Sequence, residues 1–218
     1  MTDHRTRQRR ALRGDVDFTF MYAGHDAFNR DLRRLTAAAK AGRTPDPALR
    51  AGWETFKKQL HIHHTVEDTA LWPPLRRRLD RPADVAVLDA MEAEHELIDP
   101  LLARVDAAFG AGDGPRLNAA AEELAATLTA HMEHEEEEAL PLVETHLGPK
   151  GWDAFREAIR KMQGLKGAAE FLPWLLDEAT AELADRVLSE LPAPARLLYR
   201  KRWLPSYTRT PRWTTPTA

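Results

Sequence analysis

The stretch HHTVEDTALWP at residues 63–73 is matched by the stretch HMEHEEEEALP at residues 131–141. At an offset of 68 residues the two stretches align a histidine, a glutamate four residues later and a proline six residues after that: His63, Glu67 and Pro73 in the first, His131, Glu135 and Pro141 in the second. A lone histidine precedes each stretch, and these two, His25 and His95, are 70 residues apart. The chain therefore contains two similar halves.

Helix-forming sequence surrounds both stretches. Runs rich in Ala, Leu, Glu and Arg repeat apolar residues with gaps of three and four, and the alternation typical of strands is nearly absent. Breaks rich in Gly and Pro separate helices expected at about 16–41, 46–79, 83–109 and 115–147. Because short connections place successive helices antiparallel, the sequence predicts an all-α, up-down-up-down four-helix bundle. The proline after each glutamate is expected to bend its helix just beyond that residue.

Residues 148–218 are predicted to form a second unit, a helical extension and tail that pack on the bundle of residues 16–147. Shorter helices are expected at 150–162 and about 172–190. The tail from Pro192 holds four more prolines and little periodicity, so we expect it to be irregular. Its three large aromatic residues, Trp203, Tyr207 and Trp213, are expected to anchor it.

Composition excludes several classes of protein. Cysteine is absent from the 218 residues, which excludes disulfides, iron–sulfur clusters and cysteine nucleophiles and favours a reducing cytoplasm. No apolar run approaches the roughly 18 residues of a membrane span, and the basic N-terminus lacks the apolar segment of a secretory signal. We therefore expect no membrane partner.

Charge is distributed unevenly along the chain. Residues 14–190 hold 20 of the 31 basic and 33 of the 34 acidic residues, a net charge of −13, so we expect no nucleic-acid partner. The two ends, 1–13 and 191–218, are basic. They are expected to fold back on the acidic body, and binding of an anionic partner is the alternative.

The spacing of the repeated residues predicts a metal site. Residues four apart share one face of a helix, so each His-x-x-x-Glu can direct an imidazole nitrogen and a carboxylate to one point. Four inward-facing helices would bring together four imidazoles and two carboxylates, enough for two metals, and such mixed N/O donors suit iron, manganese, zinc or copper. The predicted ligands are His25, His63, Glu67, His95, His131 and Glu135. The pair His134/Glu138 is an alternative register, and His61, His64 and His134 are expected around the site.

Rival motifs are weaker. A ferritin-like di-metal site needs Glu-x-x-His on two helices, and only Glu92–His95 fits that pattern. The zinc-protease pattern His-Glu-x-x-His and the Walker and dinucleotide-binding glycine motifs are absent.

The set of His25, His63-x-x-x-Glu67, His95 and His131-x-x-x-Glu135 resembles the hemerythrin-like (HHE cation-binding) proteins, over about residues 16–147. The resemblance implies a four-helix bundle that holds two non-haem iron ions with a bridging oxide or hydroxide, and chemistry with dioxygen, hydrogen peroxide or nitric oxide. Manganese or zinc are alternatives for the metal.

The chain departs from the oxygen-carrying members of that family. Those proteins have a second histidine four residues after the third-helix histidine and an aspartate five residues after the fourth-helix histidine, where this chain has Asp99 and Glu136. It resembles instead the subgroup with two His-x-x-x-Glu motifs. Without a fifth histidine, each iron is expected to keep an open position. Asp99 and Tyr22 are candidates for an additional ligand, and both are expected around the ligands together with His64 and Glu136.

Open positions on both irons favour catalase-like decomposition of peroxide over reversible oxygen carriage. The alternatives are an iron- or oxygen-responsive sensor without turnover and a bundle that stores or holds metal. The sequence indicates neither catalytic residues beyond the metal ligands nor an oligomeric state.

Overall fold

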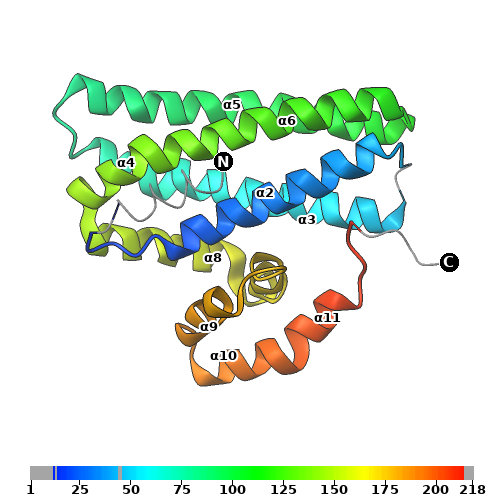
Figure 1. The fold of residues 1–218 in the computed structure, drawn as a ribbon. Coiled ribbons are helices and arrows are strands. Elements are labelled where there is room, and N and C mark those ends of the chain that lie inside the picture. Colours follow the sequence, from blue (N-terminus) through cyan, green and yellow to red (C-terminus); the bar gives the residue numbers. More distant parts are fainter. Residues whose placement is uncertain (1–11, 13, 44–45, 214–218) are drawn as a thin grey trace.

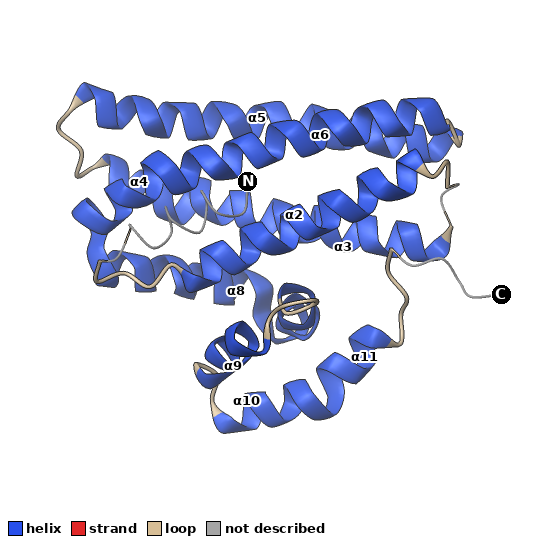
Figure 2. Ribbon diagram, in the orientation of Figure 1, coloured by secondary structure: helices blue, strands red, loops and turns tan. Residues whose placement is uncertain are grey.

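A computed structural model describes residues 12, 14–43 and 46–213. Over these residues the chain is helical and has no strand (Figure 2). Four long helices form the bundle: α2 (Thr19–Lys40), α3 (Pro47–Val66), α5 (Pro82–Ala111) and α6 (Gly114–His134) (Figure 1). The up-down-up-down bundle expected from the sequence is confirmed. Most of the basic N-terminal end lies outside the described residues. Whether this end folds back on the acidic body is therefore not tested.

Two of the four bundle helices, α3 and α6, begin at an aspartate cap. The Asp46 carboxylate accepts a hydrogen bond from the Leu49 backbone N–H at 2.8 Å, and Asp113 accepts one from the Arg116 N–H at 3.0 Å. Each cap is followed by a proline within the first turn, where the missing N–H costs no helical hydrogen bond. Within the described residues, no helix combines the length and apolarity that a bilayer crossing requires.

Both repeated motifs end in a π-helical segment. These segments, η1 (Glu67–Leu71) and η2 (Glu135–Ala139), each begin at the glutamate of the motif and are followed by α4 (Trp72–Arg76) and α7 (Leu140–Leu142). The N–H of Trp72 donates to the carbonyl of Glu67, and Leu140 does the same to Glu135. Since a proline without an N–H follows each donor, the regular ladder is interrupted at equivalent places in the two halves. A third π-helical segment, η3 (Val143–Leu147), leads out of the bundle.

Two apolar clusters fill the bundle on either side of a polar layer. One contains Phe28, Leu60 and Ile98 among others, and the other contains Met21 and Val66. Along α3 and α5 the change from one cluster to the other occurs at the motif histidines, and along α2 it occurs within the turn before His25. The candidate ligands therefore lie in a layer sealed from water at both ends by packed side chains.

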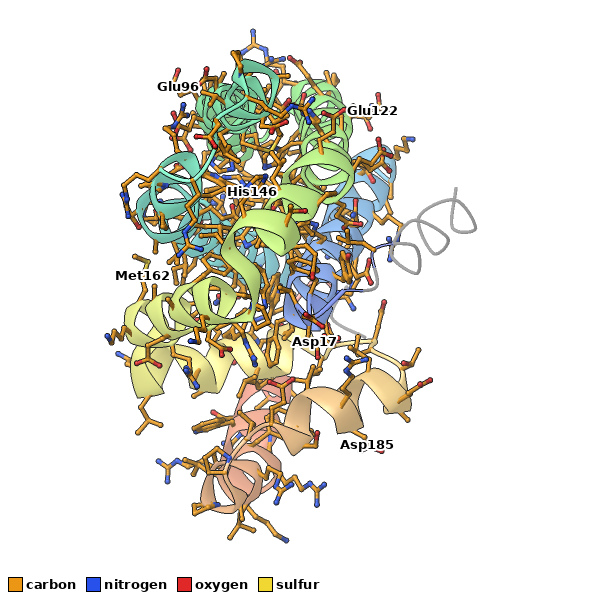
Figure 3. All side chains as sticks on the ribbon, turned by 90° about the vertical axis from the view of Figure 1, so that its left-hand side faces the viewer. Asp17, Glu96, Glu122, His146, Met162 and Asp185 are labelled. Atoms are coloured by element: carbon orange, nitrogen blue, oxygen red, sulfur yellow. The ribbon has the colours of Figure 1, made fainter. Side chains whose placement is uncertain are left out.

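The C-terminal extension forms a layer beneath the bundle: α8 (Gly148–Leu175), α9 (Ala181–Ser189), α10 (Ala193–Leu198), η4 (Tyr199–Trp203) and α11 (Leu204–Thr208) (Figure 1). Figure 3 shows Glu96 and Glu122 on one side of the molecule and Asp185 of α9 on the other. Within α8, Gly164 has φ 59° and ψ −179°, a conformation that is essentially restricted to glycine. This residue turns the second half of α8 away from the first.

The extension differs from the sequence-based expectation in two places. Residues 163–171 are helical apart from the kink, and the break lies instead at 176–180. The tail expected to be irregular after Pro192 is helical from Ala193 to Thr208. Pro194 lies in the first turn of α10, a position that tolerates proline. Pro205 follows the π-helical segment η4, in which the Leu204 N–H donates to the Tyr199 carbonyl, as Pro73 and Pro141 follow η1 and η2. A high proline content therefore did not prevent helix formation here.

A buried polar network ties the extension to α2. The carboxylate of Asp31, which is 0% exposed, accepts hydrogen bonds from Arg30 Nε at 2.9 Å and from the indole N–H of Trp174 at 2.8 Å. Arg30 also donates to the backbone carbonyls of Trp174 and Asp177, and Arg34 pairs with the Asp177 carboxylate at 2.7 Å. Asp31 thus provides the charge that the buried Arg30 requires.

The end of the described chain packs against the start of α3. The Trp213 N–H donates to the Ala48 carbonyl at 3.0 Å, and Arg43 donates to the Trp213 carbonyl at 2.6 Å. The Trp213 ring lies on Gly52, where a methyl group would stand 2.4 Å from the ring. Only glycine permits this approach.

Gly52→Ala is therefore expected to displace the Trp213 ring and to lower the free energy of unfolding by about 1–3 kcal/mol. Urea unfolding, together with the rate of proteolysis of the tail, would measure the effect. Gly110→Ala is the matched control, because a methyl group there meets no atom within 4 Å. An unchanged stability of Gly52→Ala would contradict the close packing.

Candidate metal centre

Histidines from all four bundle helices meet in the polar layer. They are His25 on α2, His63 and His64 at the end of α3, His95 on α5 and His131 on α6. Two carboxylates, Glu67 and Glu135, join them from the first residues of η1 and η2. Both glutamates and His25 are 0% exposed. A site of this composition, closed to water, would be unfavourable without a cation to balance it.

The side chains form two groups, each compact enough to hold one ion. His25, His63 and Glu135 place one ligand atom each within 4.8 Å of the others, and His64, His95 and His131 do the same. In the second group the Nε2 atoms of His95 and His131 are 3.1 Å apart. The rings of His64 and His95 stack with centroids 4.0 Å apart.

Glu67 faces both groups. Its Oε1 atom is 3.1 Å from Nε2 of His63, and its Oε2 atom is 3.6 Å from Nε2 of His95. The second glutamate, Glu135, has Oε2 at 3.0 Å from Nε2 of His25. A carboxylate whose two oxygens point to different imidazole groups has the geometry of a ligand shared by two ions.

Carboxylates outside the site orient three of the imidazoles. Nδ1 of His25 is 2.8 Å from Glu136 Oε1, Nδ1 of His95 is 2.8 Å from Asp68 Oδ1, and Nδ1 of His131 is 2.8 Å from Glu94 Oε2. A carboxylate only accepts hydrogen bonds, so each Nδ1 carries the proton. In the neutral ring Nε2 then presents a lone pair toward the centre, the arrangement found around metal-bound histidines.

The two halves of the chain repeat this orientation and then diverge. At the offset of 68, Asp68 corresponds to Glu136, and each accepts from the lone histidine of the neighbouring helix. At the offset of 70, Glu94 corresponds to Gly24, so the carboxylate that holds His131 has no counterpart beside His63. The His63 side of the centre is therefore the more open one.

Unsatisfied polar atoms indicate that the centre is built for cations. Among the described residues, the buried side-chain atoms that form no aligned hydrogen bond include Nε2 of His25, His63 and His64 and both carboxylate oxygens of Glu67 and Glu135, even though His25 Nε2 lies 3.0 Å from Glu135 Oε2 and His63 Nε2 lies 3.1 Å from Glu67 Oε1. Buried polar groups in proteins are almost always satisfied. Seven such atoms facing one another match the N/O donor set of iron or another transition metal.

Burial and neighbouring charges shift the pKa values of the groups in this site. Burial raises the pKa of Glu67 well above 4.5, and the nearby Glu135 adds to the effect. Burial lowers the pKa of His63 and His64 well below 6.5, so both are neutral and ready to bind metal. For His25, burial acts to lower the pKa, but the carboxylates of Glu135 and Glu136 outweigh it and raise the pKa to about 9.

The raised pKa of Glu67 leads to a pH-dependent expectation for the metal-free protein. The folded state keeps this proton while the unfolded chain loses it near pH 4.5, so Glu67 lowers the free energy of unfolding as the pH rises above that value. Glu67→Gln removes the titration. We expect the variant to be more stable than the parent at about pH 8, on the order of 1–3 kcal/mol, with the difference vanishing toward pH 4.5. Urea unfolding across this range would measure it, and a gain independent of pH would show that Glu67 stays ionised.

The structure brings all six predicted ligands together, and it leaves Glu138 of the alternative register exposed. His64, which the sequence suggests only as a surrounding residue, lies with the candidate ligands. Asp99, a candidate additional ligand, is exposed on α5, and Tyr22 packs against the apolar cluster that contains Met21. Of the remaining histidines, His61 is exposed and His134 bonds Glu94 at 2.8 Å.

Sequence reasoning missed Glu94 altogether. It precedes His95 by one residue, yet its side chain reaches His131 and His134 on α6. Only helix packing decides this pairing. The role of Asp68 could have been predicted from the sequence, because the repeat aligns Asp68 with Glu136.

Comparison with known proteins agrees with this centre. The family described as "Hemerythrin HHE cation binding domain" matches residues 16–143, more than half of the chain, and the matched segment contains every residue of the two groups. Searches of curated proteins and of solved structures find no match. On the family match, the chain belongs to the hemerythrin HHE cation-binding domain family, a family of metal-binding proteins.

Proposed function

We propose that the chain holds two iron ions in this centre and that hydrogen peroxide reacts at the His25–His63 side. The observation that carries the proposal is the set of buried imidazole nitrogens and carboxylate oxygens that approach one another to 3.0–3.6 Å without forming aligned hydrogen bonds. His25, His63 and Glu135 would hold one ion, His64, His95 and His131 the other, and Glu67 would be shared.

Bound iron would supply the Lewis-acid and redox chemistry that converts two molecules of peroxide into one of dioxygen and two of water. The residues of the chain keep this chemistry in place. Asp68, Glu94 and Glu136 hold the imidazole rings in their orientation, and the apolar clusters above and below exclude bulk water. Of these carboxylates, Glu136 lies closest to the proposed reaction side, because it bonds His25, and it is suited to exchange protons there.

His64 raises the number of candidate histidine ligands from the four predicted from the sequence to five. With His64, one group offers three imidazoles and the other offers two. The group with two imidazoles has the Glu135 carboxylate as its third ligand, so with Glu67 shared each ion would have four ligands from the chain, and access rather than ligand count distinguishes the two sides. His63 is the one residue of the two groups that lines a cavity of about 530 Å³ between the bundle and α8, and this cavity would give a small molecule a path to the His25–His63 side.

Reversible binding of dioxygen is the second candidate function, and His64 favours it. The oxygen-carrying members that this family resemblance implies have a fifth histidine on the third helix. This chain has Asp99 at that position of α5, but His64 on α3 supplies a fifth imidazole instead. An iron- or oxygen-responsive role without turnover remains the outcome if neither activity is found.

The test is anaerobic reconstitution with iron, followed by metal counting and by oxygen evolution after addition of peroxide. Wild type is expected to bind two irons and evolve oxygen, and His63→Ala is expected to lose the iron on its side and the activity, by about 100-fold or more. His61→Ala is the matched control, because His61 is exposed on the same helix two residues away.

Two results would overturn the peroxide proposal. Fully iron-loaded wild type without oxygen evolution would exclude it, and a long-lived oxygen adduct in its place would establish the carrier function. Equal activity in His63→Ala and His61→Ala would mean that the reaction does not occur at the centre.

A further inference from the structure

A cavity of about 530 Å³ lies between the bundle and the extension. Its walls are mainly apolar: Met21 and Phe28 from α2, Ile62 from α3, and Phe155 and Trp174 from the two halves of α8. The kink at Gly164 forms part of the wall, so the bend of α8 shapes the cavity. Its volume is within the range of pockets that enclose small organic molecules.

One end of the cavity reaches the metal centre. His63 and Gly24 both line it. Gly24 is buried, yet a methyl group at this position would meet no atom within 4 Å. Glu94 occupies the space beside His131, whereas at the equivalent position beside His63 the chain has Gly24 and the space is open.

A pair of glutamines gives the cavity a polar recognition element. Gln59 is 2% exposed and Gln163 is 9% exposed, and their amides share one hydrogen bond, from Gln163 Nε2 to Gln59 Oε1 at 2.7 Å. The remaining amide atoms, Gln59 Nε2 and Gln163 Oε1, have no partner among the described residues. Turning both amides over would still leave one donor and one acceptor. The pair therefore offers one donor and one acceptor, which match a ligand that carries an acceptor and a donor side by side.

The charged residues that line the cavity already have partners. Arg156 pairs with Glu190 and lies 5.0 Å from the centre of the Phe20 ring. Arg160 pairs with Glu157 at 2.7 Å. A ligand is thus not needed to neutralise them, and a carboxylate would place a second acceptor against a glutamine oxygen.

We propose that this cavity binds an uncharged, mostly apolar organic molecule whose edge presents a carbonyl oxygen beside an N–H group, as in a carboxamide. The carbonyl accepts from one glutamine and the N–H donates to the other, while the apolar body fills the space between α2 and α8. The bound molecule lies next to His63. Because the cavity is formed by the chain alone, the proposal stands independently of iron and of peroxide turnover.

The test uses the full-length, metal-free protein and naphthalene-2-carboxamide as the probe, with binding measured by equilibrium dialysis and by the fluorescence of the tryptophans that line the cavity. The comparison probe is 2-acetonaphthone, which keeps the ring system and the carbonyl but has no N–H. We expect the carboxamide to bind about tenfold more tightly, the effect of one additional buried hydrogen bond.

Two variants locate the probe. Gly24→Leu is expected to abolish binding by filling the cavity, and it replaces a helical glycine with a better helix former, so folding is retained. Gly110→Leu, at an exposed position with equal space, is the matched control and binds as wild type. Gln59→Met/Gln163→Met keeps the side-chain volume, and in it the two probes are expected to bind equally.

The proposal fails if neither probe binds, if wild type binds both probes equally, or if Gly24→Leu binds as well as Gly110→Leu. Since all measurements are made without iron, a failure of the metal centre to turn over peroxide would leave them unaffected, and the two proposals are tested separately.

Discussion

Glu67→Ala is expected to prevent iron from binding at both positions of the centre. The two oxygens of this carboxylate face different imidazole groups, with Oε1 3.1 Å from His63 Nε2 and Oε2 3.6 Å from His95 Nε2. In the proposed two-iron centre, removing this one side chain would therefore take a donor atom from each ion, together with a negative charge that reduces the repulsion between the two cations. Metal counting after reconstitution should fall from two irons per chain toward none.

The matched control is Glu138→Ala, which removes the same group from an exposed position on η2 and should leave two irons bound. His64→Ala provides an intermediate case, because His64 belongs to one group only. It should weaken one position and spare the other. Retention of one full equivalent of iron in Glu67→Ala would show that the two positions do not share this carboxylate.

Asp31→Ala is expected to lower the free energy of unfolding by about 3–5 kcal/mol, the usual cost of leaving a buried charge without its partner. Asp31 is 0% exposed and Arg30 is 4% exposed, so water cannot replace the lost carboxylate. The Trp174 indole N–H loses its acceptor as well. For a chain of this size the melting temperature should fall by on the order of 10 °C.

Because Trp174 belongs to α8, Asp31→Ala should also loosen the extension from α2. Faster proteolysis between α8 and α9, measured against wild type, would report this. Asp185→Ala is the control, since Asp185 is an exposed residue of α9 (Figure 3). A melting temperature close to that of wild type would mean that the Arg30–Asp31 network does not hold the two layers together.

Local sequence was sufficient for the bundle and for much of the centre. Capping by Asp46 and Asp113, the glycines between helices and the three-and-four spacing of apolar residues act within one or two turns, so they can be recognised without a structure. The repeat added long-range information, because two halves with equivalent ligands must direct them to a common centre. The side chains predicted as ligands therefore lie close together, and their binding of metal stays a prediction.

The tail shows where local rules are incomplete. Its prolines lower the propensity for helix, but Pro194 is tolerated in the first turn of α10 and Pro205 is tolerated directly after the π-helical segment η4. Trp203 and Tyr199 of this helical tail are buried in the bundle cluster, and this tertiary packing stabilises helix where the local propensity is low.

Three features depended on the tertiary structure alone: the inclusion of His64, the hydrogen bond from His131 to Glu94, and the cavity beside His63. His64 is adjacent in sequence to His63 and points about 100° away on an ideal helix, so only the angle at which α3 packs decides whether it reaches the other group. Glu94 and His131 lie on different helices, and their contact is set by the relative rotation of α5 and α6. The cavity arises because the kinked α8 covers α2 where Gly24 leaves a gap, and no repeat or local spacing in the sequence encodes that meeting of two distant surfaces.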